Sequence, residues 1–203
     1  MNPDSDEFYR LIDLMPASGR MLTKLVNKPD QAKVILAQFP LPWEQDRKIT
    51  MNLDLWDKLP QPQRDLLMLH TVCWVMGIRW FKVDLYQGLM AAGLAGMVLE
   101  VLQADAAGIV TAGGFTVLAG AQVWRKSRNT QSLLVADEAA IQVAQRRGYT
   151  KAEAAHHLMD AIASVAQIEG RPNLNFTELV RSQNLKAIAG LSPVSTPDEI
   201  RKE

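Results

Sequence analysis

His70 is the residue of this chain whose type most strongly suggests chemistry. It lies inside the apolar run Leu66–Val72. The five residues from His70 onward read His-Thr-Val-Cys-Trp. A helical zinc peptidase needs His-Glu-x-x-His, in which the two histidines bind the metal and the glutamate is the base. Here Thr71 stands at the base position and Trp74 at the second ligand position, and neither side chain can do that work. The segment therefore argues against zinc hydrolysis, and His70 is expected to be a hydrogen-bonded core histidine.

The other candidate groups are a pair of histidines and a lone cysteine. His156 and His157 are adjacent, so on a helix they point about 100° apart, which argues against one metal shared on one face. Cys73 lies at helical spacing from His70, so a Cys–His pair is geometrically open, but an inert buried thiol fits the apolar run better. A single cysteine also excludes a disulfide framework and a thiolate metal cage. We therefore expect no bound metal, no cofactor and no catalytic residue.

The overall composition is that of an ordinary globular chain. It has 203 residues with 22 basic and 22 acidic side chains, so the totals do not favour nucleic acid as a partner. Hydrophobic residues make up 48% of the chain, which excludes wholesale disorder. The first ten residues lack the basic-then-apolar pattern of a secretory signal, so we expect the protein to start in the cytoplasm.

The strongest physical signal is a 40-residue window, Leu85–Trp124, that holds only two charges, Glu100 and Asp105. Two helices with a turn near those charges would each approach the ~20 residues that cross a hydrocarbon core. Basic residues and tryptophans stand at both outer ends, as in the cytoplasmic flanks of a membrane hairpin. The alternative is the buried core of a soluble protein, because the first uncharged arm has only 15 residues, 85–99. We expect a transmembrane hairpin with the N- and C-terminal parts on the cytoplasmic side.

Outside this window, periodicity and capping signals predict helices and a small β element. Helices are expected over 8–15, from Ser18 to about Val26, and over 63–76, 133–147, 150–169 and 176–183, with short strands over 34–36 and 49–53. The predicted fold class is mainly α with a small β element, interrupted by the apolar hairpin. Three regions are expected, 1–83, 84–124 and 125–203, of which the first and last pack together as one composite domain.

The order of these segments resembles the membrane-bound zinc metallopeptidases of the heat-shock protease HtpX and CAAX prenyl endopeptidase group. In that group a strand leads to the His-Glu-x-x-His helix, and a later helix reads Glu-x-x-Ala-Asp, whose glutamate is the third zinc ligand. By this resemblance His70 matches the first histidine, Thr71 the catalytic glutamate and Trp74 the second histidine. Leu133 falls at the third ligand, and Asp137 matches the closing aspartate. The resemblance implies a pseudopeptidase with a degenerate metallopeptidase-like helical domain that has lost its metal.

Three longer strings resemble an uncharacterised, membrane-associated family of cyanobacteria and plastids. They are LMPASGRM at Leu14–Met21, FPLPW at Phe39–Trp43 and IAGLSP at Ile188–Pro193. This resemblance implies no established activity. It does imply a photosynthetic host, in which a thylakoid or plasma membrane would receive the hairpin.

Together these observations favour a non-catalytic, membrane-anchored interaction protein, such as an assembly or quality-control factor that binds other membrane proteins. One alternative is a soluble helical protein whose hairpin is a core or an oligomer interface. Another is an enzyme whose site is assembled in space, for instance from His70 and Asp137, although two ligands fall short of the three or four that zinc sites use. The sequence fixes neither the partner nor the oligomeric state.

Overall fold

The structure is a computed structural model that describes residues 3–39, 46–78 and 130–191. The chain divides into two compact units, one formed by Met1–Gly77 with Thr130–Glu203 and the other by Ile78–Asn129. The helices and strands below belong to the first unit. The expected hairpin, Leu85–Trp124, lies outside the described residues. Among the residues that are described, no helix combines the length and the apolarity needed to cross a bilayer.

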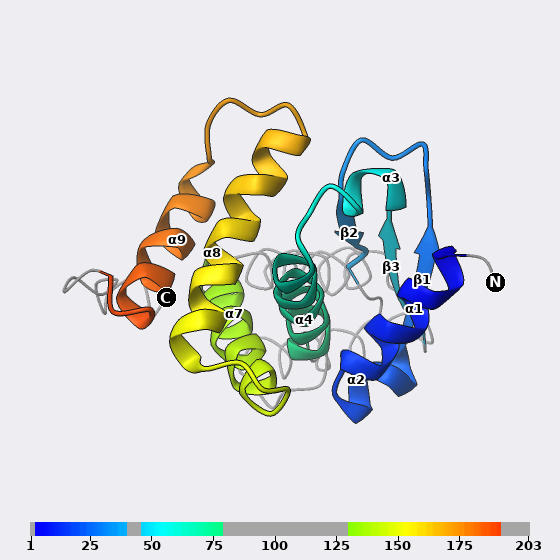
Figure 1. The fold of residues 1–203 in the computed structure, drawn as a ribbon, viewed down its shortest axis with the longest axis horizontal. Helices are drawn as coiled ribbons and strands as arrows, with labels where there is room; N and C mark the ends of the chain where they lie inside the picture. The colour runs from blue at the N-terminus through cyan, green and yellow to red at the C-terminus, as the bar shows by residue number, and fades with distance from the viewer. Residues whose placement is uncertain (1–2, 40–45, 79–129, 192–203) are drawn as a thin grey trace, which may run out of the picture. The chain divides into compact units, whose positions relative to one another are not determined.

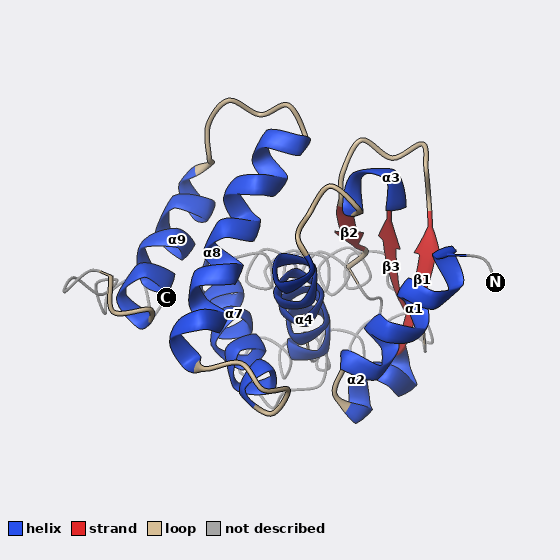
Figure 2. Cartoon of the chain, viewed as in Figure 1, coloured by secondary structure: helices blue, strands red, loops and turns tan. Residues whose placement is uncertain are grey.

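The N-terminal half builds a small mixed sheet and the short helices beside it (Figures 1 and 2). Its elements in order are α1 (Pro3–Leu14), α2 (Ala17–Leu22), β1 (Thr23–Asn27), β2 (Ile35–Ala37), β3 (Arg47–Met51) and α3 (Leu53–Trp56). The strand order is β1-β3-β2, with β1 parallel and β2 antiparallel to the central β3. Ile49 and Met51 on β3 have no exposed surface. The central strand therefore anchors the sheet to the core.

Four longer helices complete the unit: α4 (Gln61–Gly77), α7 (Thr130–Gln145), α8 (Lys151–Ile168) and α9 (Phe176–Ile188). The local signals account for their ends. Thr150 and Glu153 form a capping box at the start of α8, and Asn175 and Glu178 form one at the start of α9. Gly148 follows α7 with a φ of 97°, in the left-handed region that favours glycine. The prediction of a mainly helical fold with a small β element is confirmed.

One predicted element is wrong. A helix was expected from Ser18 to about Val26, but α2 ends at Leu22 and the chain then enters β1. Thr23 and Val26 are β-branched residues that suit a strand, and β1 pairs in parallel register with β3, Leu25 opposite Ile49. Since a strand is stabilised by a partner distant in sequence, helix-like spacing alone could not reveal it. Elsewhere the expected elements differ at their ends: α1 begins five residues before the expected 8, α9 continues five residues past the expected 183, and β2 and β3 are shifted by one or two residues. The short helix α3 was not expected.

Helix α4 lies between the sheet and the other long helices (Figure 1). Leu67, Met68 and Val72 join a core cluster with the sheet and α1. Leu66 and Leu69 join a second cluster with α7, α8 and α9. All residues from 65 to 72 are buried, and a helix that is apolar on every side is stable only in such a central place.

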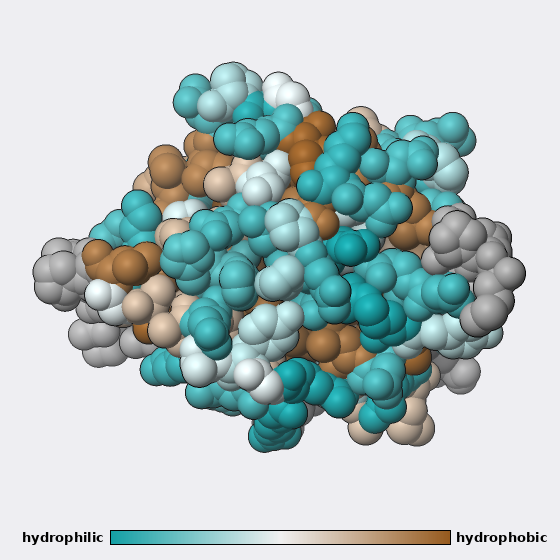
Figure 3. Space-filling model, in the orientation of Figure 1, coloured by the Kyte–Doolittle hydropathy of each residue, from teal (hydrophilic) through white to brown (hydrophobic). Residues whose placement is uncertain are grey.

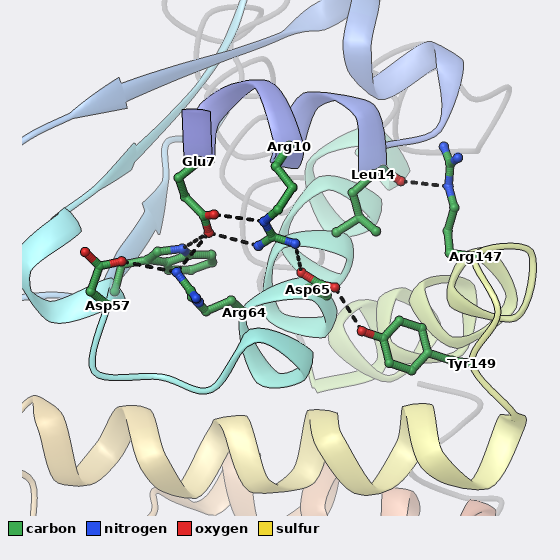
Figure 4. A network of polar contacts seen from close by, with 9 residues as sticks. Glu7, Arg10, Leu14, Asp57, Arg64, Asp65, Arg147 and Tyr149 are labelled. Atoms are coloured by element: carbon green, nitrogen blue, oxygen red, sulfur yellow. Dashed lines mark hydrogen bonds and ion pairs between the residues drawn. The ribbon is translucent and has the colours of Figure 1, made fainter. Parts of the chain in front are cut away.

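A polar network ties α1 to the first turns of α4 (Figure 4). Arg10 donates to Asp65 Oδ1 at 2.5 Å, and the hydroxyl of Tyr149 donates to Asp65 Oδ2 at 2.8 Å. Glu7 Oε1 accepts from Arg10, from the Trp56 indole at 3.0 Å and from Arg64 at 3.2 Å. The acidic groups in this network are therefore paired, and α1, α3, α4 and the α7–α8 turn are held together.

The contact between α2 and α4 depends on a residue without a side chain. A Cβ atom added at Gly19 would stand 2.6 Å from Cγ1 of Val72, closer than carbon atoms can approach. Gly77, in contrast, has nothing within 4 Å of such an atom. The glycine in the LMPASGRM string is thus explained by packing.

We predict that Gly19→Ala destabilises the fold by about 1–3 kcal/mol, as overpacking in a filled core does. Gly77→Ala, the matched control, should leave the unfolding free energy nearly unchanged. The Gly19→Ala/Val72→Ala double variant should lose less unfolding free energy than the sum of the losses of the two single variants. Denaturant unfolding followed by circular dichroism measures these three variants and the Val72→Ala single variant. Equal stability of Gly19→Ala and wild type would contradict the packing argument.

Candidate functional site

Three helices converge on one buried carboxylate. His70 lies in the middle of α4, Asp137 on the buried face of α7 and Arg181 on α9. Asp137 shares its helical face with Leu134 and Ile141, three and four residues away, and both are buried. The apolar stripe of α7 therefore carries this acid into the interior.

Asp137 is the acceptor at the centre of the cluster. Its Oδ2 accepts from Nε of Arg181 at 2.9 Å, and its Oδ1 accepts from Nη2 of the same guanidinium at 2.7 Å. Nδ1 of His70 lies 2.7 Å from the same Oδ1. The Asp137 side chain has no exposed surface, and those of His70 and Arg181 are 8% and 10% exposed. Arg181 and Asp137 therefore form a bidentate, charge-assisted ion pair, and His70 contacts the same carboxylate.

The electrostatics of the cluster fix its protonation. Burial by itself would raise the pKa of Asp137, but the Arg181 charge and the His70 ring outweigh it and lower that pKa to about 2. Burial and the Arg181 charge lower the pKa of His70, against the opposing effect of the Asp137 carboxylate. His70 is therefore neutral near pH 7. Because the ionised carboxylate only accepts, we assign the His70 proton to Nδ1, which donates to Asp137.

This arrangement binds the helices together and leaves little capacity for chemistry. A metal at Asp137 would have to compete with the Arg181 guanidinium, because both carboxylate oxygens already accept from it. The hydroxyl of Thr71 donates to the Leu67 carbonyl at 2.8 Å, a bond within the helix. Burial raises the pKa of Cys73 to about 11, so its thiol is not a thiolate near neutral pH. With its proton on Nδ1, His70 keeps an unprotonated Nε2, but its side chain is only 8% exposed, so this potential base has little access to solvent.

Among the five positions singled out by sequence, the structure brings His70 and Asp137 together. Thr71 bonds within its own helix. Trp74 and Leu133 lie on α4 and α7 and are partly buried. The indole N–H of Trp74 is buried and finds no acceptor in the described part of the chain. The prediction that no metal is bound at these positions stays a prediction.

Sequence reasoning missed Arg181, which the structure shows to be the main partner of Asp137. It falls in the helix expected over 176–183, with no motif around it. The available signal was its spacing of four residues from Leu185, which is fully buried and lies on the same face of α9. That signal requires α9 to extend beyond 183, as it does in the structure. Its pairing with a residue 44 positions away has no local signature.

With the fold and this cluster described, comparison with known proteins places the chain. It belongs to a protein family of unknown function, DUF3318, whose family model matches residues 9–149. It is also 30% identical over 129 residues to a protein named thylakoid membrane protein slr1949, from Synechocystis sp. (strain ATCC 27184 / PCC 6803 / Kazusa). The match covers 62% of this chain and 60% of that relative, so the chain spans less than two thirds of the relative's length. No solved structure is similar to this chain.

The expectation of an uncharacterised family is confirmed. The expected membrane association has the support of one relative's name. Neither finding points to a zinc metallopeptidase, and that resemblance gains no support from them. The relative's name suggests membrane association, without giving a topology.

The buried carboxylate makes a strong prediction for stability. Asp137→Asn leaves the Arg181 charge buried without a counter-charge, so we expect a loss of about 3–5 kcal/mol in unfolding free energy. The matched control is Asp13→Asn, which alters an ion pair at 3.6 Å in which the Asp13 side chain is 84% exposed. That control should change stability little. Denaturant unfolding decides, and a loss below about 1 kcal/mol for Asp137→Asn would contradict a structural role.

The same cluster predicts acid sensitivity in two stages. The pKa of His70 is lowered in the folded state. Below about pH 6.5 the unfolded chain therefore binds a proton at His70 that the folded chain does not yet bind. Stability therefore falls as pH decreases from that value. The pKa of Asp137 is also lowered, so its stabilisation is present above about pH 4 and is lost as pH falls toward 2.

Unfolding free energy measured from pH 7 to pH 5 tests the first stage. The decrease over this range should be smaller in His70→Asn than in wild type. An identical pH dependence in wild type and His70→Asn would show that His70 does not cause it.

Proposed function

We propose that the protein is a non-catalytic interaction protein, anchored in a thylakoid or plasma membrane, that serves the assembly or quality control of other membrane proteins. The observation that carries this proposal is the window Leu85–Trp124, with two charges in 40 residues and basic, tryptophan-bearing flanks. A relative named as a thylakoid membrane protein supports the membrane location. In this proposal the N- and C-terminal parts stand on the cytoplasmic side.

The geometry of the described unit supports the non-catalytic part of the proposal. His70 and Asp137 are held with Arg181 in a nearly inaccessible cluster, and Cys73 is a protonated thiol. Catalysis needs a reactive group within reach of a substrate. The residue types that first suggest chemistry are instead used to join helices.

The surface of the described unit supports a location of this unit in water, outside the membrane. Figure 3 shows a mainly hydrophilic face with separate hydrophobic patches. The exposed large hydrophobic residues belong to several elements: Tyr9, Ile12, Met21, Leu22, Leu36, Val135, Phe176, Leu179 and Leu191. Single residues of this kind are normal on a soluble surface. Membrane contact is therefore assigned to the apolar window.

The pseudopeptidase origin of the scaffold is a separate and finer prediction. It rests on the match of His70 and Asp137 to the metallopeptidase pattern and on the loss of the other ligand positions. The interaction function proposed here does not require it.

Alkaline carbonate extraction of membranes containing the tagged full chain tests the anchor. Wild type should remain in the pellet, because an integral segment is not released by pH. The double variant Leu94→Arg/Phe115→Arg places one charge in each apolar arm. An arginine near the centre of a membrane helix raises the free energy of insertion by about 2.5–3.5 kcal/mol. This variant should therefore move much of the protein to the supernatant. Leu179→Arg adds the same charge at a 54% exposed position on α9 and should behave as wild type. Release of wild type by carbonate would favour the soluble alternative.

Native electrophoresis of mildly solubilised membranes tests the interaction. Wild type should migrate in a complex larger than the single chain, and the Leu94→Arg/Phe115→Arg variant should lose that complex. Migration of membrane-retained wild type as a single chain would keep the anchor and reject the interaction function.

A further inference from the structure

Helix α8 carries an uncommon arrangement of metal-binding residue types outside the buried cluster. The sequence from Glu153 to Asp160 reads Glu-x-x-His-His-x-x-Asp. With about 100° per residue, His157 lies 100° around the helix from His156, and Asp160 lies about 40° around and one turn further on. Asp160 therefore stands between the two histidines in angle. The two histidines alone diverge by about 100°, and Asp160 adds a third side chain within that angle.

The structure brings the three side chains together. One ligand atom from each of His156, His157 and Asp160 lies within 4.8 Å of the others. Nδ1 of His156 is 3.0 Å from Oδ2 of Asp160. The two imidazole rings meet edge to face with their centroids 6.1 Å apart, and the Tyr149 ring meets His157 in the same way at 6.1 Å. The Tyr149 contact helps to orient the second histidine.

The helix beneath this cluster is firmly held. Its buried face packs into the core through Ala154, Ala155, Leu158, Ala161 and Ile162. Its first turn is fixed by the capping box of Thr150 and Glu153. The cluster itself stays accessible, since the side chains of His156 and Asp160 are 49% and 37% exposed. An ion can therefore reach it from solvent while the backbone that carries the ligands stays in place.

We propose that His156, His157 and Asp160 form a binding site for a divalent transition metal of the Zn²⁺ class, with solvent completing the coordination. Two neutral imidazoles and one carboxylate are ligands that such ions prefer. Zinc bonds of about 2.0–2.2 Å in a tetrahedron place ligand atoms roughly 3.3 Å apart. The His156–Asp160 pair is already near that separation, and a rotamer change of the partly exposed His157 would bring in the third ligand.

Glu153 is the nearest acid on the preceding turn, and we assign it a supporting role. Its Oε2 accepts from the backbone N–H of Thr150 at 2.9 Å and from the Thr150 hydroxyl at 2.7 Å. This carboxylate therefore serves the helix cap and adds negative charge beside the site. The ligand set consists of the three residues named above.

Zinc titration of the full chain tests the site. The protein is purified in detergent with a tag that contains no histidine, treated with chelator and titrated with Zn²⁺ in a calorimeter. We expect saturable binding of one ion per chain. Loss of an outer-shell partner already weakens metal sites about 10–100-fold, so His157→Gln and Asp160→Asn should each weaken binding at least about tenfold. These side chains are at least partly exposed, and unchanged circular dichroism will show that the variants fold.

Asp54→Asn is the matched control, because Asp54 is an exposed acid in the first turn of α3. It should bind Zn²⁺ as wild type does. Replacement of Zn²⁺ by Co²⁺ should give visible ligand-field absorption in wild type that is lost in Asp160→Asn. Absence of saturable binding, or equal binding by wild type, His157→Gln and Asp160→Asn, would overturn the proposal.

Discussion

The neutralisation of one buried charge is the constraint on which this unit depends. Asp137 has no exposed surface, and an ionised carboxylate in such a place is very costly unless it is paired and hydrogen-bonded. Its partners, His70 and Arg181, come from two other helices. The relative positions of α4, α7 and α9 are therefore set within hydrogen-bond tolerances, a stricter condition than apolar packing alone imposes.

Helix α4 links this constraint to the rest of the described unit. One set of its apolar residues packs with the sheet and α1, and another packs with α7, α8 and α9. It also carries two buried titratable groups, Asp65 and His70, about 140° apart around its axis. The first is bonded to Arg10 and Tyr149, and the second to Asp137. The hydrogen bonds of Asp65 and His70 thus fix the orientation of α4 about its axis, while its apolar residues pack on all sides.

These roles change how the chemical residues of the sequence are understood. A histidine followed by a cysteine at helical spacing suggests a reactive site, yet the structure gives His70 a structural partner and leaves Cys73 protonated. The more accessible histidines of α8 lie on a face that the core does not use. Chemistry in this unit is therefore to be sought at its surface, and membrane attachment in the apolar window.

The sequence by itself determined the elements whose signals are local. The Thr150–Glu153 capping box marks the start of α8, and Gly148 and Gly170 follow α7 and α8 with positive φ. Pro60 and Pro62 mark the start of α4 and Gly77 its end. These features act over one or two turns, so a short stretch of residues is enough to read them. The mainly helical fold class followed from them.

Only the tertiary structure decided which distant segments meet. Thr23–Asn27 is a strand because it pairs with Arg47–Met51, and Arg181 matters because it meets Asp137 from 44 residues away. Both depend on contacts between segments far apart in sequence. Such contacts become favourable only when a whole core is buried and each buried polar group finds a partner, and no short stretch of sequence records that outcome.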